Sequence, residues 1–259
     1  MTTARPSQRI IITGASSGIG AALARRYAAP GAVLGLIARR RDRLEQLAGA
    51  LPVPCETYPV DVRDAAGLSG AARHFTERHG TPDIVIANAG VSMGTLTDIA
   101  ADTAAFQDVL DINVIGMVNS FQPFLAGMRA AGRGTLAGIA SVAGYRGLPG
   151  AGAYSASKAA VMSYLEALRV ELRASGIRVV TISPGFIDTP MTEKNPYPMP
   201  FRMDADKAAE AIAALIARGS SYAVIPWQMA MVARVLRVVP NWLYDRLAAD
   251  VPHKPRRGD

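Results

Sequence analysis

The stretch "RIIITGASSGIGAALARRYAA" at residues 9–29 joins a short apolar run to a helical pattern through a glycine-rich turn. The apolar run "RIIIT" has the length and composition of a buried strand. Gly14, Gly18 and Gly20 allow a tight turn and the close approach of a phosphate. The helix that follows offers free N–H groups and the positive end of its dipole. The stretch therefore predicts the dinucleotide-binding turn of a first strand–helix unit.

Strand and helix patterns alternate along the rest of the chain. Further apolar runs of strand length lie at residues 32–38, 56–62, 83–90, 134–141, 177–185 and 222–226. Long helical patterns at residues 105–128 and 154–175 flank the fifth of these seven strands. Strict alternation with continuous apolar strands predicts parallel strands that are buried on both faces. We therefore expect an α/β, doubly wound (Rossmann-like), mostly parallel sheet of about seven strands with helices on both faces.

The composition fits one large core without covalent cross-links. Half of the 259 residues are hydrophobic, and we expect a single Rossmann-like domain over residues 1–259. Within it, residues 192–259 should form a variable substrate lid and a C-terminal helical extension. The single Cys55 excludes an internal disulfide and fits a reducing, cytoplasmic compartment. The polar start "MTTARPSQRI" predicts no signal peptide, and no apolar run reaches 18 residues, so we expect no membrane-spanning helix.

The formal net charge of +7 raises the question of nucleic-acid binding. The arginines are scattered, and the longest basic cluster is "RRRDR" at residues 39–43. Because the chain has no recognisable nucleic-acid module, we expect no nucleic-acid partner and assign the charge to attraction of an anionic small molecule. His74, His79 and His253 have no metal-ligand spacing, so we expect no metal.

The end of the second expected strand bears on the choice of nucleotide. An acidic residue there would bind the adenosine ribose 2′-hydroxyl and select NAD. This chain instead has Ala38 followed by Arg39 and Arg40. A guanidinium can bind a 2′-phosphate through two hydrogen bonds. Positive charge at a helix N-terminus opposes the helix dipole, and this cost suggests that the arginines have a role there. The position therefore predicts NADP(H) rather than NAD(H); the alternative is a solvated basic start of a helix.

Asn113, Ser141, Tyr154 and Lys158 are the candidate catalytic residues. Tyr154 and Lys158 are four residues apart and share a helix face, and Lys158 is the only lysine in the first 193 residues. A nearby ammonium favours the phenolate and so lowers the pKa of a tyrosine that must transfer a proton. Ser141 ends the fifth strand and is positioned to hydrogen-bond a carbonyl oxygen. Taken singly, Ser141 fits a helix cap or turn, and Asn113 fits an amide on a helix surface.

These residues and motifs resemble the short-chain dehydrogenase/reductases, in the single-domain branch of about this length. The resemblance covers residues 9–192 and includes "TGASSGIG", "DV", "NAG", Asn113, Ser141, "YSASK" and "PGFIDT" in the same order and register. It implies that Tyr154 is the general acid/base and that Lys158 lowers its pKa and holds the nicotinamide ribose. It further implies that Ser141 orients the substrate carbonyl. Asn113 would hold a helix bend and a water that links Lys158 to solvent.

The resemblance also implies a set of cofactor contacts. Asp61 and Val62 would bracket the adenine, and Ile187 and Thr189 would contact the nicotinamide amide. Ser16 departs from relatives that carry a second basic residue at this position, although its hydroxyl can still bind a phosphate. The full set expected for NADP(H) is Gly14, Ser16, Ser17, Gly18, Ile19, Gly20, Arg39, Arg40, Asp61, Val62, Asn88, Ala89, Gly90, Tyr154, Lys158, Pro184, Gly185, Ile187 and Thr189.

The substrate side is less constrained by motifs. Val142, Tyr145, Phe186 and Met191 are candidate lining residues, and their apolar character predicts a hydrophobic ketone or alcohol; the alternative is that they are simply packed. The apolar stretch at residues 225–247, with interleaved arginines, either packs on the domain or a second subunit, covers the pocket, or rests on a membrane surface.

The sequence thus predicts an NADP(H)-dependent oxidoreductase that acts on a carbonyl or secondary alcohol, with a hydrophobic or lipid-like substrate. We expect a homodimer or homotetramer, located in the cytoplasm or peripheral to a membrane through the C-terminal segment. The alternative is an NADP-binding regulatory protein without turnover, although such a sensor has no need of the four candidate catalytic residues. An epimerase or dehydratase of larger relatives would need a further C-terminal substrate domain.

Overall fold

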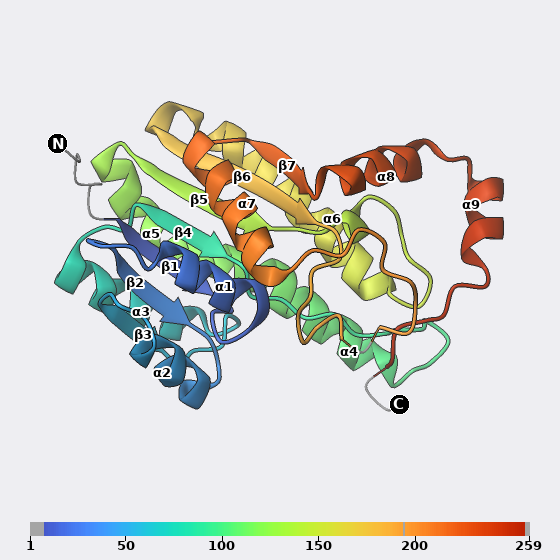
Figure 1. The fold of residues 1–259 in the computed structure, drawn as a ribbon, viewed down its shortest axis with the longest axis horizontal. Coiled ribbons are helices and arrows are strands. Elements are labelled where there is room, and N and C mark those ends of the chain that lie inside the picture. Colours follow the sequence, from blue (N-terminus) through green and yellow to red (C-terminus); the bar gives the residue numbers. More distant parts are fainter. Residues whose placement is uncertain (1–7, 194, 257–259) are drawn as a thin grey trace.

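A seven-stranded parallel sheet forms the centre of the computed structural model, which describes residues 8–193 and 195–256 (Figure 1). The strand order is β3-β2-β1-β4-β5-β6-β7. The strands are β1 (Arg9–Thr13), β2 (Val33–Ile37), β3 (Cys55–Tyr58), β4 (Ile84–Ala87), β5 (Gly134–Ile139), β6 (Ile177–Pro184) and β7 (Tyr222–Ile225). The predicted doubly wound sheet is therefore confirmed, and each expected apolar run overlaps a strand. The first seven residues, where no signal peptide is expected, and the last three lie outside the described part.

Helices cover both faces of this sheet, as Figure 1 shows. They are α1 (Gly18–Tyr27), α2 (Arg41–Gly49), α3 (Ala65–His79), α4 (Asp102–Leu110), α5 (Gly116–Ala131), α6 (Gly152–Glu171), α7 (Ala205–Arg218), α8 (Trp227–Val238) and α9 (Asn241–Ala248). Successive side chains of a strand point to opposite faces, and β1 illustrates the result. Ile10 and Ile12 pack in one core with Leu23 of α1. Ile11 packs in the other core with Phe75 of α3.

The strand order reverses beside β1, and this reversal positions the site. The chain runs outward from β1 through β2 to β3, and then returns to form β4 on the other side of β1. Connections leave β1 and β4 in opposite directions, so a crevice opens at their carboxyl ends. The glycine-rich turn after β1 and the "NAG" segment after β4 therefore meet at one edge of the sheet.

The helical pattern at residues 105–128 is one long run with a local irregularity. Asp111–Ile115 forms a π-helical segment between α4 and α5. By length and composition, the run Asp102–Ala131 is the one helix of the described residues that could cross a membrane. However, its Met117, Phe121 and Phe124 lie in the core beside the sheet. Burial inside the fold therefore accounts for its apolar character.

The C-terminal segment forms two helices that extend from the body of the fold (Figure 1). The loop between them contains Pro240, which caps the start of α9. Met229 and Ala233 of α8 are buried, whereas Trp227, Met231, Val235 and Val238 are exposed. Spacings of three and four residues place these exposed side chains on one helix face. Of the three alternatives for this segment, packing on the domain is thus observed for one face of α8.

Candidate active site

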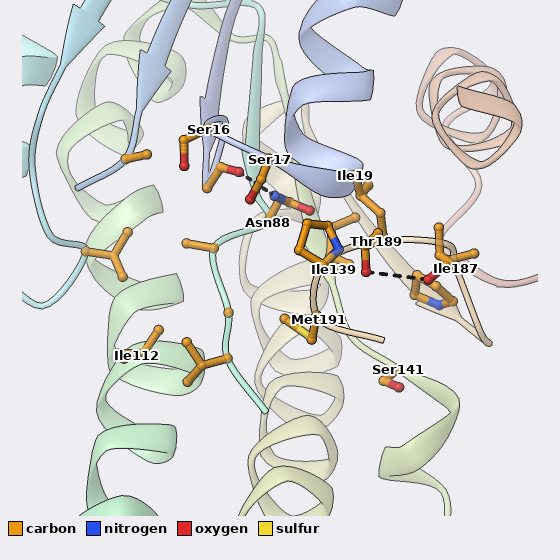
Figure 2. A pocket seen from close by; sticks show the side chains of 18 of the residues that line it. Ser16, Ser17, Ile19, Asn88, Ile112, Ile139, Ser141, Ile187, Thr189 and Met191 are labelled. Carbon is orange, nitrogen blue, oxygen red and sulfur yellow. Dashed lines mark hydrogen bonds between the residues drawn. The ribbon is translucent and has the colours of Figure 1, made fainter. Parts of the chain in front are cut away.

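A cleft of about 270 Å³ lies at the carboxyl ends of the strands, where the strand order reverses. Most of the residues expected to bind a nucleotide line it: Gly14, Ser16, Ser17, Ile19, Arg39, Arg40, Asp61, Val62, Asn88, Ala89, Gly90, Tyr154, Lys158, Pro184, Gly185, Ile187 and Thr189. Ser141 lines it as well, whereas Gly18, Gly20 and Asn113 do not. Figure 2 shows Ser16 and Ser17 at one end of this pocket and Ser141 at the other.

The glycine positions of the turn after β1 leave no room for a side chain. Gly14 and Gly18 have positive φ angles of 68° and 53°, which L-residues with a Cβ rarely adopt. A Cβ on Gly14 would lie 2.8 Å from the Cα of Ala89, and a Cβ on Gly20 would collide with the carbonyl oxygen of Gly14. A Cβ on Gly18 would lie 3.1 Å from the Thr189 side chain. Gly18 and Gly20 therefore contribute to the conformation of the turn and do not line the cleft.

Asn88 fixes the turn to the neighbouring strand. Its amide nitrogen donates hydrogen bonds to the carbonyl oxygens of Thr13 at 3.1 Å and Gly14 at 3.4 Å. Its backbone N–H donates to the hydroxyl of Thr13 at 3.2 Å. These bonds hold the ends of β1 and β4 together and orient the first turn of α1 toward the cleft. The backbone cradle and the helix N-terminus fit the phosphates of a dinucleotide.

Basic side chains gather at the end of β2. Nη2 of Arg40 donates to the hydroxyl oxygens of Ser16 and Ser17, both at 3.1 Å. Arg39 lies 4.0 Å from a carboxylate oxygen of Asp61 and is largely exposed. Two guanidinium groups and two hydroxyl groups thus converge at one end of the cleft, which fits an anionic group.

Arg63 is a charged neighbour of this region that sequence reasoning missed. Its side chain forms an ion pair with Asp61 at 2.8 Å. The hydrogen bond from Arg63 lowers the pKa of the Asp61 carboxyl, against the opposing effect of burial. Asp61 therefore stays ionised and is held beside the cleft. The two residues are two positions apart in the turn before α3, a spacing that gives no periodic signal for an ion pair.

Tyr154 and Lys158 lie on the first two turns of α6. The Nζ atom of Lys158 lies 5.7 Å from the centroid of the Tyr154 ring, and it donates a 2.8 Å hydrogen bond to the carbonyl oxygen of Ile139. Burial lowers the pKa of Lys158 to about 8. The small residues around this pair, such as Gly90 opposite Lys158, allow other groups to approach the helix face closely.

The pKa of Tyr154 differs from the sequence expectation. Burial raises the pKa of its phenol above the usual range, and a hydrogen bond with Ser141 lowers it by less. We expected Lys158 to lower this pKa, but the lysine ammonium faces the ring and binds Ile139. Desolvation of the phenolate therefore outweighs the stabilising contacts, and Tyr154 is a protonated phenol at neutral pH.

Ser141 has a structural contact as well as its place beside Tyr154. It follows β5 and caps the short 3₁₀ turn Val142–Gly144. Its hydroxyl oxygen accepts a hydrogen bond from the backbone N–H of Ala143 at 3.1 Å. The cap that we considered as an alternative is thus present. Because the capping bond uses one lone pair, the hydroxyl proton remains available to the cleft.

Asn113 is fully buried in the π-helical segment, so the alternative of a helix-surface amide is wrong. Its Oδ1 atom accepts from the backbone N–H of Val91 at 2.8 Å, and its Nδ2 atom donates to the carbonyl oxygen of Val91 at 2.9 Å. Nδ2 also donates to the hydroxyl of Ser157 at 2.9 Å. Asn113 thus connects the segment after β4 to α6 without lining the cleft itself. Sequence reasoning missed Ser157, whose hydroxyl donates to the carbonyl oxygen of Tyr154 at 2.7 Å.

The segment after β6 closes the other side of the cleft. The hydroxyl of Thr192 donates to the carbonyl oxygen of Ile187 at 2.6 Å, and the hydroxyl of Thr189 donates to the same oxygen at 3.4 Å, as drawn in Figure 2. These bonds fold the chain into a compact turn that places the Met191 side chain in the pocket. Met191 is therefore the expected substrate-side residue that does line the cleft.

The other three expected substrate-side residues are not among those that line this cleft in the described chain. The Tyr145 hydroxyl forms a hydrogen bond with the hydroxyl of Tyr222. The Phe186 ring packs against the ring of Tyr197, with centroids 6.3 Å apart. Val142 begins the 3₁₀ turn after Ser141. For Tyr145 and Phe186, the alternative interpretation of simple packing describes what the structure shows.

The loop after Ser141 is held by the C-terminal helices. Arg146 donates to the carbonyl oxygens of Leu236 at 3.0 Å and Val239 at 2.6 Å, and to the Asn241 side chain at 2.8 Å. The guanidinium carbon lies 4.3 Å from the centroid of the Tyr244 ring. The C-terminal segment therefore supports the loop that leads from Ser141 to Tyr154.

The donor set of the cleft consists of hydroxyl, phenol, ammonium, guanidinium and backbone N–H groups. Among the described residues, no cluster of three or more His, Cys, Asp or Glu side chains could hold a metal ion. The arrangement can bind an anionic cofactor at one end and exchange a proton through Tyr154 at the other.

Comparisons with known proteins agree with this arrangement. The family model for short chain dehydrogenases matches residues 8–198. An uncharacterized oxidoreductase of Myxococcus xanthus is 39% identical over 241 residues, which cover 92% of this chain and 95% of that protein. The crystal structure of levodione reductase has a TM-score of 0.79 at 29% identity, covering 87% of this chain and 99% of that one. An alcohol dehydrogenase of Thermococcus sibiricus, complexed with 5-hydroxy-NADP, has a TM-score of 0.75 at 27% identity, with coverages of 85% and 96%.

Proposed function

The chain belongs to the short-chain dehydrogenase/reductase family and is an oxidoreductase, and from this premise we propose that it reduces ketones, or oxidises secondary alcohols, with NADP(H). One observation carries the proposal: the Tyr154 phenol and the Ser141 hydroxyl line the same cleft as the glycine-rich turn. A proton donor and a nucleotide cradle thus lie at two ends of one site. NADPH, when bound there, supplies a hydride.

Tyr154 supplies the proton. Reduction of a carbonyl develops negative charge on its oxygen, and this charge must be neutralised by a general acid. Because burial raises the pKa of Tyr154, the residue carries its proton at neutral pH. The Ser141 hydroxyl binds the same oxygen and stabilises the developing charge.

Lys158 and Asn113 support this proton transfer. The Lys158 ammonium is anchored by the carbonyl oxygen of Ile139, lies 5.7 Å from the centroid of the Tyr154 ring and lines the cleft. From that position it would hold the ribose hydroxyls of a bound nucleotide. Asn113 acts from behind as a positioning residue, because its amide joins Val91 to the helix that carries Tyr154.

The preference for NADP(H) rests on the basic end of the cleft. Arg40, Ser16 and Ser17 form one hydrogen-bonded group, and Arg39 lies beside it. No acidic residue stands at the end of β2 to bind a ribose 2′-hydroxyl. A 2′-phosphate would accept hydrogen bonds from both arginines and from the serine hydroxyls. The 5-hydroxy-NADP bound to the Thermococcus sibiricus enzyme supports the same choice.

The substrate end of the cleft favours apolar compounds. Val91, Ile112 and Met191 are apolar residues that line the cleft, and Figure 2 shows Met191 between Ile112 and Ser141. We propose a hydrophobic or lipid-like ketone or secondary alcohol as the substrate. The expected homodimer or homotetramer, the cytoplasmic location and contact of the C-terminal segment with a membrane remain predictions. The exposed apolar side chains of α8 form the surface on which a second subunit or a membrane would rest.

The direct test is a turnover assay with ketones of graded size and polarity. NADPH consumption is followed for each ketone, and the same panel is repeated with NADH. We expect turnover of the larger apolar ketones, with kcat/KM higher for NADPH. Binding of NADPH without turnover of any ketone or alcohol would instead support the regulatory alternative.

A further inference from the structure

The C-terminal tail returns from α9 to the mouth of the cleft. In Figure 1 the chain leaves α9, and its described part, residues 249–256, runs back along the molecule toward α4. The carbonyl oxygen of Pro255 accepts a hydrogen bond from the backbone N–H of Gly94 at 2.9 Å. Arg256 forms an ion pair with Asp102, the first residue of α4, at 3.7 Å. The tail is therefore attached to the long connection that follows β4.

The tail also contacts the loop that leads into α6. The His253 ring packs directly on Gly150, where a Cβ would lie 2.5 Å from the ring. The backbone N–H of Thr95 donates to the carbonyl oxygen of Gly150 at 3.0 Å, which joins the two loops that the tail touches. Gly152 begins the helix that carries Tyr154. The tail thus lies against the segments that flank Tyr154.

A second cavity, of about 310 Å³, opens at this place. It is lined by Leu96, Gly150, His253, Lys254, Pro255 and Arg256. Three of these side chains are basic and none is acidic. Nζ of Lys254 donates to the carbonyl oxygen of Met191 at 3.4 Å, and Met191 itself lines the catalytic cleft. Lys254 therefore links the second cavity to the turn whose Met191 lines the first.

Lys254 forms no ion pair with the described part of the chain. Arg256 is paired with Asp102, whereas no carboxylate of residues 8–193 and 195–256 lies within ion-pair distance of the Lys254 ammonium. Burial lowers the pKa of Lys254 to about 8, so the group is still largely charged at neutral pH. A partly desolvated ammonium with one long hydrogen bond is costly unless an anion completes its contacts.

The choice of lysine is also unusual in this chain. Only four of its 28 basic residues are lysines, and one of the four is Lys158. A compact ammonium can donate to one carboxylate oxygen from several directions, so it places fewer demands on the orientation of an anion than a planar guanidinium does. The single unpaired charge matches a monoanion, and the apolar walls formed by Leu96 and Pro255 disfavour a more strongly hydrated dianion.

We infer that Lys254 binds a carboxylate at the outer end of the substrate site, so that the preferred substrates are apolar keto acids. The carbonyl would lie at Tyr154 and the carboxylate at Lys254, with the chain between them passing Met191. This inference rests on the proposed function and deepens it, because it adds a charged end to an otherwise hydrophobic substrate. It also gives the tail a role as the outer wall of the substrate site.

The test compares keto acids with their methyl esters, which differ in charge and little in length. For the wild-type enzyme with NADPH, we expect kcat/KM for a medium-chain keto acid to exceed that of its ester by about tenfold or more, mainly through KM. Lys254→Gln should reduce this ratio to about one while the rate with the ester is kept. Lys207→Gln removes an exposed charge on α7 and should leave the ratio unchanged.

Two further measurements keep the test decisive. Lys254→Arg retains the positive charge, so it should keep most of the preference even if the tail tolerates glutamine poorly. Isothermal titration of non-reducible acid and ester analogues should show the same ratio in binding, independent of turnover. An equal acid-to-ester ratio in wild type and Lys254→Gln, or no acid preference in the wild type, would overturn the inference. Absence of turnover with the esters as well would contradict the proposed function instead.

Discussion

The ammonium of Lys158 lies 5.7 Å from the centroid of the Tyr154 ring, inside the fold and only 4% exposed. An isolated buried charge is costly, and its cost appears as the fall in the pKa of Lys158 from 10.5 to about 8. We propose that this lysine serves the reaction, because its buried charge lowers the free energy of unfolding and so does not serve stability.

Replacing Lys158 with Met should therefore stabilise the protein while it abolishes turnover. We expect the free energy of unfolding at pH 7 to rise by about 2 kcal/mol. Removal of the desolvated charge stabilises the folded protein, and loss of the hydrogen bond to Ile139 offsets part of that gain. Thermal unfolding followed by circular dichroism measures this change. Lys207→Met, at an exposed position on α7, is the matched control.

The pH dependence has a definite sign. Between pH 8 and pH 10.5 the unfolded chain binds more protons at Lys158 than the folded protein does, because the folded pKa is depressed. The stability contributed by this site therefore rises with pH across that window, and the advantage of Lys158→Met should shrink to near zero above it. A melting temperature of Lys158→Met below that of the wild type at pH 7 would contradict this explanation.

Replacing Arg40 with Ala should weaken NADPH binding selectively. The guanidinium is held by the hydroxyls of Ser16 and Ser17 at the end of the cleft, where we propose that a 2′-phosphate binds. We expect the Kd for NADPH to rise at least tenfold, and the Kd for NADH to change less than twofold. Arg39→Ala should act in the same direction. Arg43→Ala removes the same charge from an exposed position on α2 and is the control. An equal rise in the Kd for NADPH in Arg43→Ala would show that Arg40 acts through net charge and not through a specific contact.

Asn113→Ala should lower both stability and kcat. The change leaves the buried backbone groups of Val91 and the hydroxyl of Ser157 without their partner. We expect a loss of about 2–4 kcal/mol in the free energy of unfolding, and a loss in kcat because the helix carrying Tyr154 is no longer tied to the segment after β4. Asn119→Ala, which removes one hydrogen bond to Val62, should cost about 1 kcal/mol and leave kcat unchanged. Similar losses in the two variants would argue against a positioning role.

Arg146→Ala should loosen the loop between Ser141 and Tyr154. The guanidinium binds the last turn of α8 and the side chain of Asn241, and it stacks over Tyr244. We expect faster hydrogen exchange at residues 145–150 and a higher KM for the ketone, with the Kd for NADPH unchanged. Arg237→Ala, at an exposed position on α8, provides the control. Unchanged exchange in Arg146→Ala would show that the C-terminal helices do not support this loop.

The sheet and the nucleotide end of the cleft could be predicted because their signals are local. Continuous apolar runs identify buried parallel strands, and the glycines between β1 and α1 need only their own neighbours to form the turn. Tyr154 and Lys158 share a helix face by spacing alone. Ser141 could be placed because it directly follows a strand that ends at the same edge of the sheet.

The remaining features depend on contacts between residues distant in the chain. The apolar pattern around Asn113 is helical, but its periodicity does not show that Asp111–Ile115 is a π-helix or that the amide binds Val91. The upward shift in the pKa of Tyr154 arises from burial, which the sequence expectation based on Lys158 did not include. The return of the tail to Gly94 and Gly150 has no local signal, so the cavity at Lys254 was not predicted.

The central claim is that the phenol of Tyr154 supplies the proton in a reduction that uses NADPH. The most direct measurement is the single-turnover rate of NADPH oxidation by Tyr154→Phe with a ketone that the wild type reduces, together with the Kd for NADPH from its fluorescence. We predict a fall in rate of at least a thousandfold with the Kd within about threefold of the wild type, because the ring is retained and only the proton donor is lost. A Tyr154→Phe enzyme that oxidises NADPH at the wild-type rate would contradict the account.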